Sequence, residues 1–165
     1  MKFFTAAWTQ GELSDEEAEA VVPAYWAHIS TLAERMPATV YTLAYGVNIH
    51  DGRLRAVLFD RPRATLMLSM RCGDNQVGYY DLDLVYRDVI LTAAAVEVLR
   101  EVASTSDAEA LYDELDVSDA GSWVHSILFW PDREISVTFG RLALKLEPMP
   151  DREFDRPADV YRDVL

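Results

Sequence analysis

His125, together with the carboxylates of Asp113 and Glu114, forms the combination in this sequence best suited to acid–base chemistry. These residues occupy two segments of alternating hydrophobicity, 110–117 and 123–130, joined by the turn sequence Ser-Asp-Ala-Gly. If the segments form a hairpin, a four-residue loop places Glu114 opposite His125, and a loop shorter by one residue places Asp113 there. Such a pair can orient a general base or supply half of a metal site. The interpretation we favour is a cross-strand pair that stabilises a sheet.

Two further carboxylates, Asp81 and Asp83, alternate with apolar residues in the segment 77–86. Alternating acids share one face of a strand, which favours a solvated sheet surface. If either acid converged with Glu114 and His125, the side chains would form a divalent-cation site, and the protein could be a metal-dependent hydrolase. Because no motif with an established ligand spacing occurs, we expect no metal ion and no other cofactor.

The remaining residues with reactive side chains favour structural roles. Cys72 is the single cysteine, which excludes an internal disulfide and a cysteine-based zinc site. It opens a turn sequence, where we expect a small hydrophobic residue that closes a strand and not a nucleophile. His28 falls beside the apolar stripe of a predicted helix, and His50 precedes a turn, so we expect a structural and a solvated histidine.

The elements that must position these residues are predicted from capping signals and hydrophobic period. Ser14-Asp15-Glu16-Glu17 is a capping box, and the apolar stripe that follows predicts a helix that continues to Pro37. From Val40 the period changes to two, which predicts antiparallel strands at 40–49, 53–59, 64–71 and 77–86. An alanine-rich helix over 92–102 separates these from strands at 110–117, 123–130 and 134–139.

The turn sequence Asp51-Gly52 predicts a two-residue hairpin loop, which sets the register of the first strands. Counted outward from this loop, the register places Val57 and Phe59 together on the outer face of the sheet, which also carries Asp81 and Asp83. An apolar patch on a solvent-facing surface requires a cover. Either the N-terminal helix packs there, or the patch contacts a second subunit or another protein.

Together these elements predict an α+β fold with an N-terminal helical segment plus an antiparallel β-sandwich or open barrel, with one helix between two sheet segments. A chain of 165 residues corresponds to one domain. We predict a single domain over 1–148 and a peripheral C-terminal tail over 149–165, where Asp, Arg and Pro are frequent.

The charge of the chain bears on its partners. Asp and Glu number 28 against 15 Lys and Arg, a formal net charge of −13, which repels nucleic acids. The longest apolar stretch, 89–96, is far too short to span a bilayer, so we expect no nucleic-acid or membrane partner and a cytoplasmic location. An acidic surface favours a basic protein partner, with self-association as the other possibility.

Several short strings of strand and turn residues stand out, namely Met1-Lys2-Phe3-Phe4-Thr5-x-x-Trp8, His50-Asp51-Gly52, Arg71-Cys72-Gly73-Asp74, Gly78-Tyr79-Tyr80-Asp81-Leu82, Leu111-Tyr112-Asp113-Glu114-Leu115-Asp116 and His125 with Leu128-Phe129-Trp130. In these strings, spread over most of residues 1–148, the chain resembles a small bacterial family described only as a domain of unknown function. In class it is also similar to the small acidic immunity proteins that bacteria encode beside toxins. Neither resemblance implies a catalytic residue.

We therefore expect a non-catalytic, immunity-like cytoplasmic binding protein that recognises a basic protein through its acidic surface. The candidate contact residues are Asp113, Glu114, Asp116 and His125 on the second group of strands and Val57, Phe59, Asp81 and Asp83 on the first. Two alternatives stay open. One is a β-barrel that binds a small ligand in a pocket lined by Tyr41, Tyr45, Tyr80 and Tyr86. The other is the metal-dependent hydrolase that uses Glu114 and His125 with Asp81 or Asp83.

Overall fold

The protein is described by a computed structural model that covers residues 1–106 and 108–165. Within these residues the helices are α1 (Ala6–Thr9), α2 (Asp15–Leu32), the 3₁₀ helix η1 (Ala33–Arg35), α3 (Ala38–Gly46) and α4 (Ala93–Ser104). The strands are β1 (Gly52–Asp60), β2 (Thr65–Asp74), β3 (Gly78–Arg87), β4 (Glu109–Val117), β5 (Trp123–Phe129), β6 (Arg133–Phe139), β7 (Arg141–Met149) and β8 (Tyr161–Val164). The predicted α+β class, with α4 between two groups of antiparallel strands, is confirmed.

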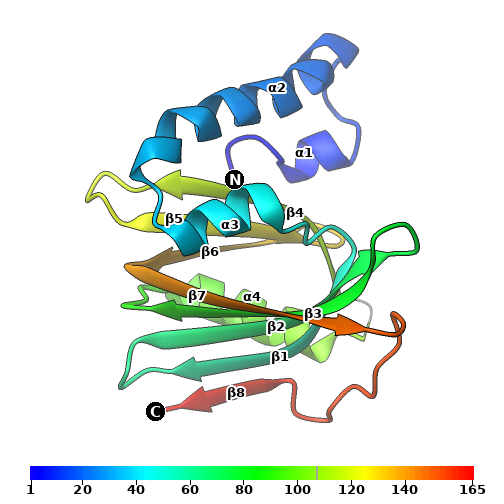
Figure 1. Cartoon of the computed structure of the whole chain (residues 1–165), viewed down its shortest axis with the longest axis vertical. Coiled ribbons are helices and arrows are strands. Elements are labelled where there is room, and N and C mark those ends of the chain that lie inside the picture. Colours follow the sequence, from blue (N-terminus) through cyan, green and yellow to red (C-terminus); the bar gives the residue numbers. More distant parts are fainter. Residues whose placement is uncertain (107) are drawn as a thin grey trace.

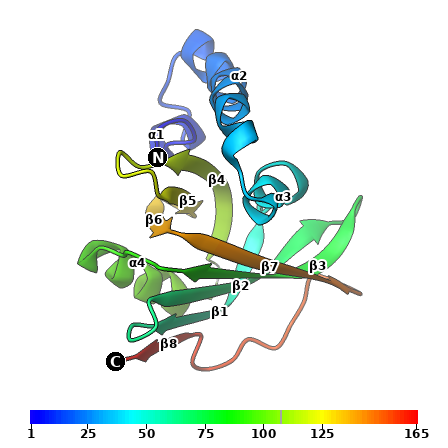
Figure 2. The same ribbon diagram turned by 60° about the vertical axis from the view of Figure 1, so that its left-hand side comes forward.

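All strands belong to one open sheet with the order β6-β5-β4-β1-β2-β3-β7. The sheet has two groups of strands, β4 to β6 on one side and β1, β2, β3, β7 and β8 on the other. Among the described strands, the two groups are joined where Gly52 and Arg53 of β1 pair with the start of β4. Farther along, β1 pairs instead with β8, which runs parallel to it. Most of that edge of β4 is therefore free of strand pairing. The two groups fold toward each other, with α1 and α2 over β4 and β5 and with α3 and α4 on opposite sides of the molecule (Figures 1 and 2).

The core lies between the two groups of strands. Leu66, Leu68 and Leu84 from β2 and β3 are fully buried, as are Ile127 and Phe139 from β5 and β6. Burial of apolar side chains of this size stabilises the fold by about 1.5–3 kcal/mol for each residue. The two groups of strands therefore share one hydrophobic core.

The prediction of a strand over 40–49 is wrong, because residues 38–46 form the helix α3. Pro37 occupies the N-cap position of this helix, where a missing backbone N–H costs nothing. Val40 and Leu43 are three residues apart and buried, while Tyr41 and Tyr45 are four apart and exposed. The apolar residues of this segment therefore fit a helix at spacings of three and four, and they fit a strand at a spacing of two. Packing against the rest of the protein selected the helix.

The predicted outer patch of Val57 and Phe59 is also wrong. A β-bulge between Leu54 and Ala56 inserts an extra residue into β1, which reverses the side-chain alternation beyond it. Val57 and Phe59 consequently pair with buried leucines of β2, and they are only 1% and 7% exposed. They belong to the core and not to a docking surface.

The segment 149–165, predicted as a peripheral tail, crosses the outer face of β1–β3 before it forms β8. The Arg71 guanidinium donates to the backbone carbonyls of Asp151 and Glu153, at 2.7 and 2.9 Å. The Phe154 ring lies 5.4 Å from the same guanidinium carbon and 5.5 Å from that of Arg55. The segment is thus held by arginines that the sheet presents on this face.

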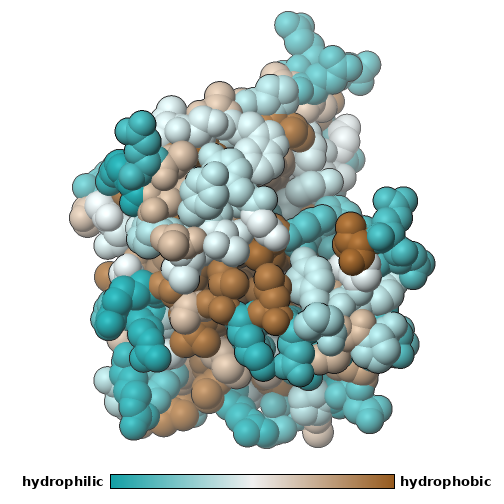
Figure 3. Space-filling view, in the orientation of Figure 1, coloured by the Kyte–Doolittle hydropathy of each residue, from teal (hydrophilic) through white to brown (hydrophobic). Residues whose placement is uncertain are grey.

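The strand β7 pairs with β3 and forms one edge of the sheet. Figure 3 shows hydrophobic atoms gathered over the middle of the visible face, at the level of β7 and below α3. Leu146 of this strand is 43% exposed, whereas Leu142 is buried.

No helix among the described residues is long and apolar enough to cross a bilayer.

Candidate functional site

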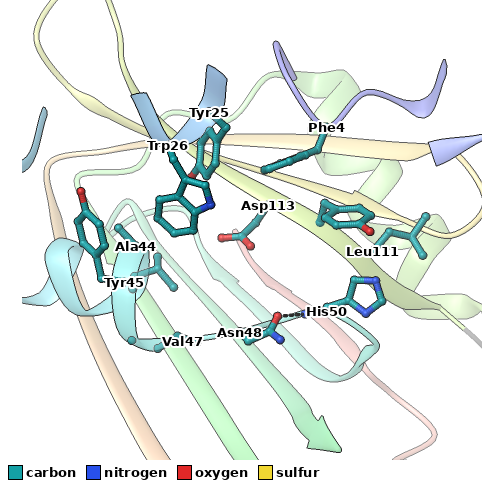
Figure 4. A pocket seen from close by; sticks show the side chains of 13 residues that line it. Phe4, Tyr25, Trp26, Ala44, Tyr45, Val47, Asn48, His50, Leu111 and Asp113 are labelled. Atoms are coloured by element: carbon teal, nitrogen blue, oxygen red, sulfur yellow. Dashed lines mark hydrogen bonds between the residues drawn. The ribbon is translucent and has the colours of Figure 1, made fainter. Parts of the chain in front are cut away.

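A cavity of about 510 Å³ lies where α2, α3 and β4 meet. Its walls are largely aromatic and comprise Phe4, Tyr25, Trp26, Tyr45 and Tyr112. The polar side chains that reach it are those of Asn48, His50 and Asp113. Figure 4 shows the Asp113 carboxylate at the centre of this group, with Trp26, Tyr25 and Phe4 on one side of it and Asn48 and His50 on the other.

The helix α2 supplies one wall of the cavity through the adjacent residues Tyr25 and Trp26. Tyr25 belongs to the buried stripe of the helix, and its hydroxyl accepts a hydrogen bond from the Leu115 N–H at 3.1 Å. This N–H lies on the edge of β4 that β1 leaves unpaired. Trp26 follows at the rim, is 43% exposed, and has its ring centroid 5.8 Å from that of Tyr45 on α3.

The opposite wall depends on the N-terminal segment. The Phe4 ring stacks on Tyr112 with centroids 5.2 Å apart and meets Tyr25 edge-on at 4.8 Å. Beyond Tyr112, the His50 ring contacts it edge-on at 5.0 Å. Tyr112 and His50 also border a second cavity of about 460 Å³, which includes Trp8 and Trp130. Residues from three separate parts of the chain thus close the site.

Asp113 is held by a hydrogen-bonded chain that begins in the core. Its Oδ2 lies 2.9 Å from His125 Nε2, and His125 Nδ1 lies 2.7 Å from the Tyr86 hydroxyl. His125 and Tyr86 are both fully buried. A neutral imidazole with its proton on Nε2 satisfies every group, because it donates to Asp113 and accepts from Tyr86. Burial, reinforced by the charge of Asp113, raises the pKa of Tyr86 well above its ordinary value, so the hydroxyl keeps its proton.

The charge of Asp113 acts on several buried groups. Burial raises the pKa of Cys72 to about 12 and that of Tyr80 to about 12, and the negative charge of Asp113 contributes to both shifts. Burial and Asp113 also raise the pKa of Tyr25. Among the described residues, the one basic side chain in hydrogen-bond contact with the Asp113 carboxylate is the imidazole of His125. Asp113 is therefore a negative centre that no lysine or arginine neutralises.

The predicted association of His125 with a carboxylate is confirmed, but both predicted registers are wrong. Leu115 lies opposite His125, and Asp113 reaches the ring diagonally from two residues along β4. Diagonal neighbours in an antiparallel pair remain within reach of long side chains. The register therefore brings Asp113, and not Glu114, to the histidine.

Glu114 points to the other face of β4 and is 5% exposed. Its carboxylate accepts hydrogen bonds from the backbone N–H groups of Lys2, Phe3 and Phe4, at 2.8, 2.6 and 2.6 Å. Its role is to anchor the N-terminal segment, and so to hold Phe4 in the cavity wall. The neighbouring Asp116 binds the Lys2 ammonium and lies 3.0 Å from His28 Nε2. Burial raises the pKa of Asp116, but hydrogen bonds from Lys2 and the Val117 N–H outweigh it and leave the pKa below its usual range.

The carboxylates of Asp81 and Asp83 on β3 have partners other than His125. Asp81 is buried and pairs with Arg71 and Arg55, at 2.5 and 2.6 Å. Asp83 accepts a hydrogen bond from the Ser69 hydroxyl at 2.6 Å. Both belong to the outer face beneath the C-terminal segment. The four side chains considered for a divalent cation therefore do not converge.

Of the four tyrosines predicted to line a pocket, only Tyr45 does so. Tyr41 is exposed, Tyr86 acts from the core through His125, and the Tyr80 hydroxyl donates to the backbone carbonyl of Asn48 at 2.6 Å. Sequence reasoning missed Trp26, Phe4, Asn48 and the cavity position of His50. Trp26 carried a usable signal, because it is a large aromatic residue outside the apolar stripe of its helix.

Cys72 is expected to react slowly with thiol reagents in the folded protein. It is 1% exposed, and burial raises its pKa to about 12, so little thiolate forms near neutral pH. At pH 8, modification by 5,5′-dithiobis(2-nitrobenzoate) should be at least about a hundredfold slower than in urea-unfolded protein. Equal rates in the two states would show that the thiol is accessible.

A scan against protein-family models, a search of curated proteins and a search of solved structures each found no match for this chain. The geometry of the cavity therefore carries the functional argument.

Proposed function

We propose that the protein binds a small organic ligand in the cavity formed by α2, α3 and β4. The observation that carries this proposal is an aromatic cavity of about 510 Å³ on which a few polar side chains converge. Small-molecule sites have volumes of roughly 300–1,000 Å³, apolar or aromatic walls and a small number of orienting polar groups.

A basic protein partner is the second candidate, and it is supported by the net charge of −13. We rank it lower because most of the residues expected to contact such a partner have other positions or partners. Glu114 and Asp81 are buried and hydrogen-bonded, Asp116 pairs with Lys2, and Val57 and Phe59 lie in the core. A cytoplasmic location, self-association and the resemblance to an uncharacterised bacterial family remain predictions.

The test is a thermal-shift and ligand-observed NMR screen with alkylamines, quaternary ammonium salts, aromatic carboxylic acids, nucleosides and sugars. A compound present at 100 times its Kd should stabilise the protein by about 2.7 kcal/mol. Ala44→Phe places a ring in the cavity and should abolish the effect, since Ala44 lines it from α3. Ala38→Phe is the matched control, because Ala38 is exposed in the first turn of the same helix.

Two results would overturn the proposal. In the first, no compound of the panel binds, and native mass spectrometry of freshly purified protein detects no bound small molecule. In the second, compounds bind the Ala44→Phe variant as tightly as they bind the unmodified protein, which would locate the binding elsewhere.

A further inference from the structure

The carboxylate of Asp113 is arranged to meet a positive charge in the cavity. One of its oxygens, Oδ2, is engaged by His125, while no described residue donates a hydrogen bond to Oδ1. The side chain is 23% exposed, so it is neither fully hydrated nor sealed in the core. The buried chain through His125 and Tyr86 fixes its orientation. A charge held in place by packed neighbours is preorganised for a ligand.

No cation within the described part of the chain occupies this position. The lining residues include neither lysine nor arginine. Basic side chains that contact other residues of β4 have partners there, since Lys2 pairs with Asp116 and Arg152 with Glu109. The net charge of −13 further raises the local concentration of cations and repels anions.

The walls around Asp113 suit a cation with an apolar shell. Trp26, Tyr25, Phe4 and Tyr45 bring ring systems to the same cavity, and ring faces attract cations. A primary ammonium group carries three N–H donors, each of which requires an acceptor. Among the lining side chains other than Asp113, Asn48 Oδ1 already accepts from the His50 N–H at 3.0 Å, and the Tyr25 hydroxyl already accepts from the Leu115 N–H at 3.1 Å. A quaternary ammonium has no N–H donor, and a tertiary ammonium has one, which the free oxygen of Asp113 can accept.

Resting on the proposed function, we infer that the ligand of this cavity is a quaternary or tertiary organic ammonium ion. Its charged nitrogen lies beside Asp113, and its alkyl groups contact the rings of Trp26 and Tyr25. The remainder of the ligand occupies the apolar part of the cavity that Leu43, Val47 and Leu111 complete.

The test compares probes that differ in charge at constant shape. Choline and its carbon isostere 3,3-dimethylbutan-1-ol are titrated into the protein by NMR, together with benzyltrimethylammonium and the primary amine ethanolamine. We expect both quaternary probes to bind at least about tenfold more tightly than the neutral isostere. Ethanolamine should bind more weakly than choline.

Asp113→Asn should remove the preference for choline over its isostere. Asp119→Asn carries the same substitution on the exposed turn after β4 and should keep the preference. If Asp113→Asn does not fold, Trp26→Leu provides a second variant. Trp26 lies at the rim with 43% of its surface exposed, so the fold should tolerate its loss while choline binding weakens several-fold.

The outcomes separate this inference from the proposed function. If the neutral isostere or ethanolamine binds as tightly as choline, and Ala44→Phe blocks that binding, the ammonium inference fails and the ligand site stands. If Trp26→Leu binds choline at full affinity, the aromatic contact is wrong and the inference also fails. If neither these probes nor any compound of the wider screen binds, both proposals fail.

Discussion

Replacing Asp81 by asparagine is expected to lower the free energy of unfolding by about 3–5 kcal/mol, because it leaves a buried arginine without its counter-ion. Arg71 is 6% exposed, and its Nε lies 2.5 Å from Asp81 Oδ1. The second oxygen of Asp81 receives Arg55 Nη1 at 2.6 Å. An asparagine keeps the volume of the side chain, but it has no negative charge and presents an amide donor to one of the two arginines, which requires an acceptor. Urea denaturation followed by circular dichroism measures the loss.

Asp83→Asn is the matched control, since it makes the same change on the same strand and face. Asp83 accepts from the neutral Ser69 hydroxyl and is half-buried, so its loss should cost less than about 1 kcal/mol. Limited proteolysis provides a second readout. Arg71 holds the carbonyls of Asp151 and Glu153, and the Asp81→Asn variant should therefore be cleaved faster within residues 150–160. Equal stability of the two variants would contradict a buried role for this ion pair.

Replacing Glu114 by glutamine is expected to cost about 3 kcal/mol and to release the N-terminal segment. The carboxylate accepts the N–H groups of Lys2, Phe3 and Phe4, and an amide would turn one acceptor into a donor that faces them. Buried N–H groups without acceptors are costly. Hydrogen exchange should show loss of protection at these amides, along with a lower midpoint of urea denaturation.

Asp116→Asn is the control for Glu114→Gln, because its ion pairs are with the partly exposed side chains of Lys2 and His28 and not with the buried N–H groups of the N-terminal segment. Surface pairs of this kind contribute about 0–1 kcal/mol. Ligand binding distinguishes the two roles further. Loss of Glu114 frees Phe4 from the cavity wall and should weaken any compound found to bind there. If both variants lose the same stability and keep amide protection at residues 2–4, the anchoring role of Glu114 is wrong.

Short-range features were predictable from the sequence alone. The capping box of Ser14 and Glu17 starts α2 as expected, and Thr92 caps α4 through the Ala95 N–H. The strands β2 to β6 begin and end within about three residues of the segments that their alternating residues predict. In each case a few neighbouring residues supply the hydrogen bonds or the single buried face that selects the conformation.

Packing decided the features for which the local pattern was ambiguous. In residues 40–46 the helical and extended spacings coincide, and the burial of Val40 and Leu43 selected the helix. In β1 the bulge after Leu54 reversed the alternation, which turned Val57 and Phe59 into the core. No turn residue announces this bulge, since it arises from the fit of β1 against its partner strand.

The candidate site is mostly a product of tertiary structure. Asp113 and His125 are 12 positions apart in adjacent strands, so their association was predictable, although their register was not. Tyr86 joins them from 39 positions away, and Phe4 and Trp26 come from the N-terminal region. These contacts form because the sheet folds over and β4 separates from β1, which leaves a free strand edge that α2 contacts through the Tyr25 hydroxyl. The sequence by itself determined the acidic charge and most of the elements, although not the helix α3, and only the packing of distant elements around that edge determined the cavity.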